Sequence, residues 1–109
     1  MFYPTVNLPV ISENPMNTLV VMSRLKNNNA RVSLTCEADG ASSYYWQRQH
    51  DSIPSRATGV NTSNLTIVNM QLEDACYYRC VAINDVGSTE SEYAKLTVTG
   101  ICMILKIIY

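Results

Sequence analysis

The sequence has little charge and few residues of the kind that hold metals. Asp, Glu, Lys and Arg make up only 16% of its 109 residues, the formal net charge is −1, and there is one histidine. A nucleic-acid partner requires a strongly basic face, so this composition argues against DNA or RNA binding. His50 is far in sequence from all four cysteines and no C-x-x-C pair occurs, so a zinc site has poor ligand support.

Motifs for catalysis and for cofactor binding are also missing. There is no glycine-rich phosphate loop and no H-E-x-x-H sequence. The three residue types of a serine hydrolase stand together as His50-Asp51-Ser52, but that chemistry needs them on separate elements that converge beside an oxyanion hole. Neighbours in one loop cannot converge in this way. We therefore expect no enzyme activity, no cofactor, no metal and no small-molecule substrate.

Long apolar runs are absent at both ends. Met1 is followed by Phe-Tyr-Pro, without the basic and apolar regions of a signal peptide. The apolar segment Ile101–Tyr109 is shorter than the roughly 20 residues that a membrane-spanning helix needs. We expect a fragment of a larger protein, associated with a membrane only through parts outside this chain.

What the sequence does have is the patterning of an all-β domain. Turn residues recur at short intervals and the segments between them alternate, which is typical of a sandwich or barrel. The polar stretch 51–64 predicts a short connecting strand at best, and Gly87 in the turn 84–87 is able to supply a positive φ. Three inward-facing rows are expected: Val32, Leu34 and Cys36; Tyr78, Cys80 and Ala82; and Ala94, Leu96 and Val98.

One constellation of residues is more specific than these patterns. Cys36 and Cys80 lie 44 residues apart on two different expected strands, and Trp46 follows the first cysteine. Tyr78 precedes Cys80 by two positions, so both side chains point to the same face. A sandwich needs a device that pins two sheets face to face across a core about 10 Å thick.

With these residues the sequence resembles the intermediate set of the immunoglobulin superfamily over roughly residues 8–99. The matching features, in chain order, are Cys36, Trp46, Leu65-Thr66-Ile67, the Asp-x-x-x-Tyr-x-Cys run at 74–80, Asn84 with Gly87, and Leu96-Thr97-Val98. The span between Trp46 and Leu65 is short for a variable-type domain with two extra strands. Residues 1–7 are then an N-terminal extension, and residues 100–109 an apolar tail that matches nothing in the family.

The resemblance implies both a fold and a set of structural residues. The fold is a two-sheet antiparallel β-sandwich with Greek-key topology, pinned by a Cys36–Cys80 disulfide. In the family, an acid at the position of Asp74 often pairs with a basic residue before the Leu65 strand, and Arg56 is the only candidate. The core signature residues are Trp46, Leu65, Asp74, Tyr78 and Leu96.

The other two cysteines depart from the family pattern. Cys76 stands where Gly or Ala is usual, and Cys102 lies in the tail. Two unpaired thiols are one alternative. A second bridge between them is another, since folding back the last hairpin brings residue 102 near residue 71; a link between two chains is a third.

Two overlapping sequons suggest modification in the secretory pathway. Asn61-Thr62-Ser63 and Asn64-Leu65-Thr66 both have the acceptor pattern for an N-linked glycan. They are so close that one glycan can exclude the other.

The outer face of the sheet that contains the Trp46, Cys80 and Leu96 strands has the composition of a protein interface. Tyrosine and arginine are frequent in such surfaces, although outer faces also carry these residues as cross-strand pairs. The residues expected on this face are Tyr45, Gln47, Tyr77, Arg79, Val81, Ile83, Tyr93 and Lys95.

These features predict an extracellular protein-recognition module of a cell-adhesion molecule or cell-surface receptor. It would bind a protein, either homophilically or heterophilically. The alternative is a structural spacer, as in matrix proteins or intracellular muscle-type proteins.

Overall fold

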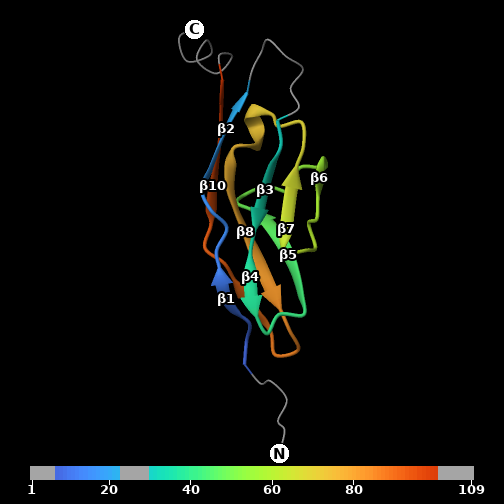
Figure 1. Ribbon diagram of the computed structural model, residues 1–109. Helices are drawn as coiled ribbons and strands as arrows, with labels where there is room; N and C mark the ends of the chain where they lie inside the picture. Colours follow the sequence, from blue (N-terminus) through green and yellow to red (C-terminus); the bar gives the residue numbers. More distant parts are fainter. Residues whose placement is uncertain (1–6, 23–29, 101–109) are drawn as a thin grey trace, which may run out of the picture.

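The computed structural model describes residues 7–22 and 30–100, and these fold as an all-β sandwich (Figure 1). The elements are β1 Val10–Glu13, β2 Thr18–Met22, β3 Val32–Thr35, β4 Glu37–Asp39, β5 Ser43–Arg48, β6 Ala57–Thr58, β7 Asn64–Ile67, the 3-10 turn η1 Leu72–Asp74, β8 Cys76–Ile83, β9 Ser88–Glu90 and β10 Ala94–Gly100. The predicted fold class is confirmed. The expected tail, Ile101–Tyr109, and nearly all of the extension 1–7 lie outside the described residues.

Two main sheets face one another. The larger has the order β2-β10-β8-β5, with β9 paired to β8, and the smaller has the order β3-β7-β6. A separate pair, β1 with β4, extends the sandwich at one end (Figure 1). All pairings are antiparallel except that of β2 with β10, which is parallel. The strands that contain Trp46, Cys80 and Leu96 are thus neighbours, as expected.

The N-terminal segment contributes to two of these pairings. β1 pairs with β4, and after Asn14-Pro15 the chain continues as β2 beside β10. Two asparagines hold the crossing in place: Asn14 Oδ1 accepts a hydrogen bond from the Glu92 amide and Asn17 Oδ1 accepts one from the Lys95 amide. The break between β1 and β2, at Asn14-Pro15, therefore moves the chain from one pairing to the other.

Alternating side chains fill the space between the sheets. The three predicted inward rows are all buried, with exposed fractions of 6% or less for every member. Met70, which was not predicted, is also fully buried. The polar stretch 51–64 contains the two-residue β6, which pairs with β7, and β7 itself begins at Asn64.

The turn 84–87 differs in one respect from the prediction. Positive φ angles occur among the described glycines at Gly40 and Gly59, but not at Gly87. The turn is closed instead by Asn84, whose Oδ1 accepts hydrogen bonds from the Val86 and Gly87 amides. A Cβ at position 87 would lie 2.8 Å from Leu8 Cδ2, so glycine serves close packing here rather than an unusual backbone angle.

Gly59 and Gly87 give a matched pair of substitutions. Gly59 has φ +74° and a Cβ there would lie 2.1 Å from the Asn64 carbonyl oxygen, so Gly59→Ala should reduce the free energy of unfolding by about 3 kcal/mol or more. Gly87→Ala meets only the end of an exposed, flexible leucine, so we expect a loss under about 1 kcal/mol. Urea unfolding of both variants measures the difference, and equal losses would contradict this account of Gly59.

Candidate functional site

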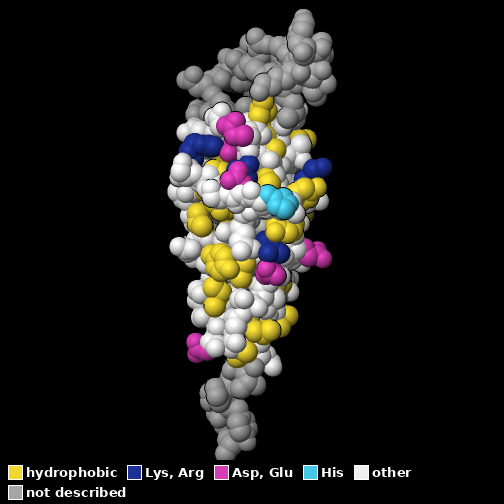
Figure 2. Space-filling view, turned by 180° about the vertical axis from the view of Figure 1, so that it is seen from behind, with side chains coloured by type: hydrophobic (Ala, Val, Ile, Leu, Met, Phe, Trp, Pro, Cys, Tyr) yellow, Lys and Arg dark blue, Asp and Glu magenta, His cyan; other side chains and the backbone are white. Residues whose placement is uncertain are grey.

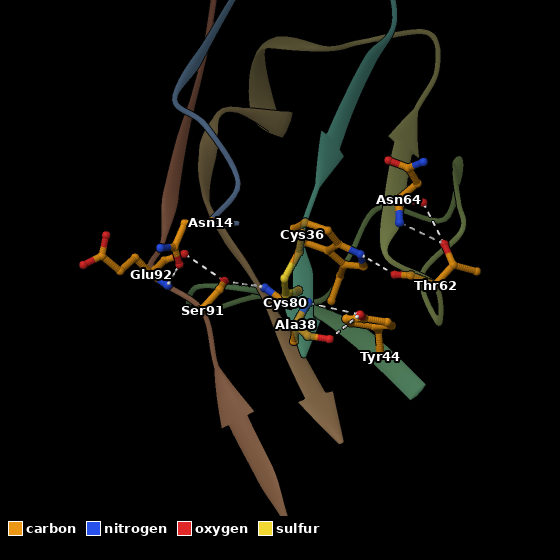
Figure 3. Close-up of a disulfide and its surroundings, with 10 residues drawn as sticks. Asn14, Cys36, Ala38, Tyr44, Thr62, Asn64, Cys80, Ser91 and Glu92 are labelled. Atoms are coloured by element: carbon orange, nitrogen blue, oxygen red, sulfur yellow. Dashed lines mark hydrogen bonds between the residues drawn. A yellow bond between two sulfur atoms is a disulfide. The ribbon is translucent and has the colours of Figure 1, made fainter. Parts of the chain in front are cut away.

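A disulfide joins the two sheets in the core that lies behind the candidate binding face. Cys36 and Cys80 are bonded, both fully buried, with their Cα atoms 6.4 Å apart (Figure 3). Trp46 is paired with Cys80 in register and donates a hydrogen bond from Nε1 to the Thr62 carbonyl oxygen at 2.8 Å. The Cys80 amide donates to Ser91 Oγ, which in turn donates to the Glu92 carbonyl oxygen. The disulfide that the resemblance implied is present.

A second buried group fixes the corner before β8. The Tyr78 hydroxyl donates to the Asp74 carbonyl oxygen at 2.7 Å, which is a tyrosine corner. The Asp74 carboxylate accepts two hydrogen bonds from Arg56, at 2.8 and 3.1 Å, and one from the Gln71 amide. This hydrogen bonding raises the pKa of Arg56. The ion pair therefore joins the residues that the resemblance suggested.

The outer face of the larger sheet carries the expected residues, but these residues differ in how far their side chains are exposed to solvent. Tyr45, Tyr77 and Lys95 are exposed, whereas Gln47, Arg79, Ile83 and Tyr93 are half-buried. Val81 is the exception, since its side chain is only 1% exposed. It lies between Tyr45 of β5 and Glu90 of β9, its partners in the two neighbouring strands. The expectation that Val81 offers contact surface is therefore wrong, because β9 adds a neighbour that alternation alone does not show.

Arg79 is held on several sides at the centre of this face. Its Nε donates to Gln47 Oε1 at 2.8 Å and its Nη2 lies 2.6 Å from Glu90 Oε2. The guanidinium stacks over the Tyr93 ring at 4.6 Å, and Tyr93 meets Tyr77 edge to face at 6.4 Å. Such a side chain has lost most of its rotational freedom before any partner arrives, which lowers the entropic cost of binding.

A shallow hollow lies beside this cluster. It has a volume of about 400 Å³ and is lined mainly by polar side chains from the end of β5, the following turn, β8 and the segment before β10, including Gln47, His50, Ser52, Arg79 and Tyr93. Seen from behind in Figure 2, the molecule has apolar patches interrupted by neighbouring basic and acidic side chains. That mixture suits a polar, partly wet protein contact more than burial of an apolar ligand.

Three further residues belong to this face and were not predicted. Leu19 and Val21 of β2 are 60% and 69% exposed and lie beside Thr97 and Thr99 of β10. Glu90 is the acidic partner of Arg79. Alternation in β2 could have shown that Leu19 and Val21 point to the side of the strand opposite to Val20. The parallel pairing of β2 with β10 could not be read from the sequence.

The remaining candidate residues do not form a reactive centre in the described part of the chain. Asp51 Oδ1 accepts from the Ser52 amide and its Oδ2 lies 3.8 Å from Arg48, so His50-Asp51-Ser52 makes a turn. Within residues 7–22 and 30–100, no cluster of His, Cys, Asp and Glu could hold a metal ion. The same residues include no helix that is long and apolar enough to span a membrane.

Of the two extra cysteines, only Cys76 lies within the described residues. Cys76 is half-buried, donates from Sγ to the Gln49 carbonyl oxygen, and forms no disulfide with any described residue. Cys102 lies outside the described residues, so the pairing alternatives stay predictions.

Tyr78 gives a pH-dependent prediction. Burial raises its pKa from 10.0 to about 12, so the folded protein holds this proton more tightly than the unfolded chain does. Its contribution to stability is therefore complete below pH 10 and is lost as the pH rises toward 12. Absorbance titration at a tyrosinate wavelength should show a late step that Tyr78→Phe removes. If Tyr78→Phe instead removes a titration step at the ordinary tyrosine pKa and the late step remains, the late step does not belong to Tyr78.

The burial of Val81 is tested by comparing it with its cross-strand partner. Val81→Asp places an unpaired charge in a site that is 1% exposed, so it should lower the free energy of unfolding by about 3 kcal/mol or more. Tyr45→Asp, at a site 37% exposed, should cost about 1 kcal/mol. Thermal and urea unfolding measure both changes, and similar small losses would show that Val81 is accessible after all.

The comparisons with known proteins agree with this geometry. The immunoglobulin domain family profile matches residues 9–84. A curated relative, MAM domain-containing glycosylphosphatidylinositol anchor protein 1 of Gallus gallus, is 30% identical over 93 residues, which is 83% of this chain and 9% of that protein.

Solved structures with the same fold include tandem immunoglobulin repeats of Dlar and the N-terminal Ig1-2 module of the Drosophila receptor protein tyrosine phosphatase DLAR. Both are 25% identical to this chain, with TM-scores of 0.72 and 0.69. The matches cover 88% and 87% of this chain, and 50% and 47% of those chains. The chain thus spans about half of these solved structures and a small part of the curated relative. One of these neighbours belongs to a receptor protein tyrosine phosphatase, and the chain itself belongs to the immunoglobulin domain family.

Proposed function

We propose that this chain is an extracellular protein-recognition module, one domain of a larger cell-adhesion molecule or cell-surface receptor. The observation that carries the proposal is the fixed Arg79, flanked by Tyr93 and beside the exposed Tyr77 on the outer face of the larger sheet. The names of the relatives support the setting, since one is a glycosylphosphatidylinositol anchor protein and another a receptor phosphatase.

The face has the properties that favour protein contact. Tyr and Arg are over-represented among residues that dominate binding energy, because they offer large contact area and several donors. Arg79 is pre-organised by Gln47 and Glu90, so little further ordering is needed when a partner binds. Leu19 and Val21 extend the exposed surface across β2 and supply apolar area at its margin.

The strand arrangement also supports our assignment to the intermediate set. β6 pairs with β7 of the smaller sheet, and among the described residues no strand of the extra variable type continues the larger sheet beyond β5. We further propose that the binding partner is a protein and that the binding surface consists of Tyr45, Gln47, Tyr77, Arg79, Ile83, Tyr93 and Lys95, together with Leu19 and Val21. Val81 lies within this face between Tyr45 and Glu90, but it is buried and is left out of the binding surface.

A binding screen tests the proposal. The full chain, displayed as a multimer to raise sensitivity, is applied to a panel of purified receptor and adhesion ectodomains that includes a second copy of this chain. For any partner found, Tyr77→Ala and Arg79→Ala should each weaken binding about tenfold or more, equivalent to about 1.4 kcal/mol.

The matched control for Arg79→Ala is Arg31→Ala. Arg31 is exposed and lies immediately before β3 of the smaller sheet, so its removal should leave affinity unchanged. All variants must keep the melting temperature of the parent within a few degrees. Equal binding by parent and Arg79→Ala, or loss of binding in Arg31→Ala alone, would place recognition on another surface. Absence of any partner across the panel would favour the spacer role.

A further inference from the structure

The two sequons have different structural settings. Asn61 is an exposed residue in the bend between β6 and β7, whereas Asn64 is the first residue of β7. Acceptor asparagines in secreted proteins are characteristic of surface loops. The local structure therefore favours Asn61 over Asn64.

The two asparagines also differ in their hydrogen bonds. Asn64 Oδ1 accepts from Thr35 Oγ1 at 2.5 Å, and its sequon hydroxyl, on Thr66, is shared with Ser33 Oγ at 2.9 Å. Across the described residues, the side-chain amide of Asn61 has no hydrogen-bond partner and is open to solvent. Of the two sequons, only the one that begins at Asn64 is therefore hydrogen-bonded to the neighbouring strand of the smaller sheet.

The bend that carries Asn61 is fixed to the core. The Trp46 amide donates to the Val60 carbonyl oxygen at 2.9 Å, Trp46 Nε1 donates to the Thr62 carbonyl oxygen, and the Cys36 amide donates to the Ser63 carbonyl oxygen. Within the bend the Thr62 hydroxyl lies 2.9 Å from both the Gly59 and the Asn64 carbonyl oxygens, and it accepts a hydrogen bond from the Asn64 amide. Figure 3 shows the contacts between Thr62 and Asn64. Asn61 is therefore held at a defined place beside β5.

That place is one of the two edges of the larger sheet, the one formed by β5. In the order β2-β10-β8-β5, β5 has a partner strand on one side only. Among the described residues, its other side is covered by the Val60 contact with Trp46 and by an isolated bridge between Arg48 and Asp51. An incompletely paired edge can pair with another chain, and proteins commonly block such edges.

We propose that Asn61 carries an N-linked glycan and that this glycan shields the free edge of β5. The proposal relies on the extracellular placement given above. In the transfer, Asn61 Nδ2 forms a bond to the anomeric carbon of a lipid-linked oligosaccharide pyrophosphate. The bond from that carbon to the pyrophosphate oxygen breaks, the lipid pyrophosphate leaves and Nδ2 loses one proton to a base, without any redox change.

Glycan occupancy is tested by secreting the full chain from eukaryotic cells behind a vector-encoded signal sequence. Intact mass before and after glycosidase treatment should show one glycan. That glycan should be lost in Asn61→Gln and in Ser63→Ala, which leaves the asparagine in place, and kept in Asn64→Gln. A glycan retained in Asn61→Gln, or a secreted and disulfide-bonded chain with none, overturns the site.

Edge shielding is tested on the same three proteins. Sedimentation velocity at increasing concentration should show self-association of Asn61→Gln and Ser63→Ala, while Asn64→Gln stays as monomeric as the parent. All variants share the apolar residues 101–109, so any association due to that segment cancels in the comparison. Monomeric Asn61→Gln overturns the shielding role. Because occupancy is read from mass alone, failure of the partner screen with an intact glycan counts only against the proposed function.

Discussion

Two cysteines brought together from positions 36 and 80 close a covalent link between the facing sheets, and the indole of Trp46 packs in the same core. A native disulfide in a small secreted domain contributes about 2–5 kcal/mol, which is much of the stability that so small a core can reach. The hydrogen bonds around it extend in two directions, from Trp46 to the bend that carries Asn61 and from Cys80 to Ser91. The positions of the surface features therefore depend on this link.

On the larger sheet the consequence is a rigid outer face. β8 supplies Cys80 to the inside and Arg79 to the outside, so the strand that is pinned by the disulfide also holds the guanidinium. β9 and β5 then add Glu90 and Gln47, which fix Arg79 from either side. Strands β5 and β9 also flank Val81, which is buried between them. Val81 is therefore on this face without being part of its accessible surface.

The two sheets differ in the surfaces they offer. The larger presents tyrosines and an arginine, while the smaller presents hydroxyl and amide groups that bond one another, as Ser33 does with Thr66 and Thr35 with Asn64. The proposed glycan at Asn61 would stand at the border between them, beside the open edge of β5. The domain would then have an accessible recognition face and a protected edge.

The sequence by itself determined the local features: the inward rows, the short strand in 51–64 and the set of residues whose resemblance to the family implied the disulfide. These depend on side-chain alternation and on residues with restricted backbone angles, which are properties of a few neighbours in the chain. Tertiary structure alone decided which strands became neighbours. The parallel pairing that brings Leu19 to the face, the burial of Val81 between β5 and β9, and the contact between Gly87 and Leu8 all join distant segments. Such contacts depend on register and on the space left by other strands, and local periodicity does not encode either.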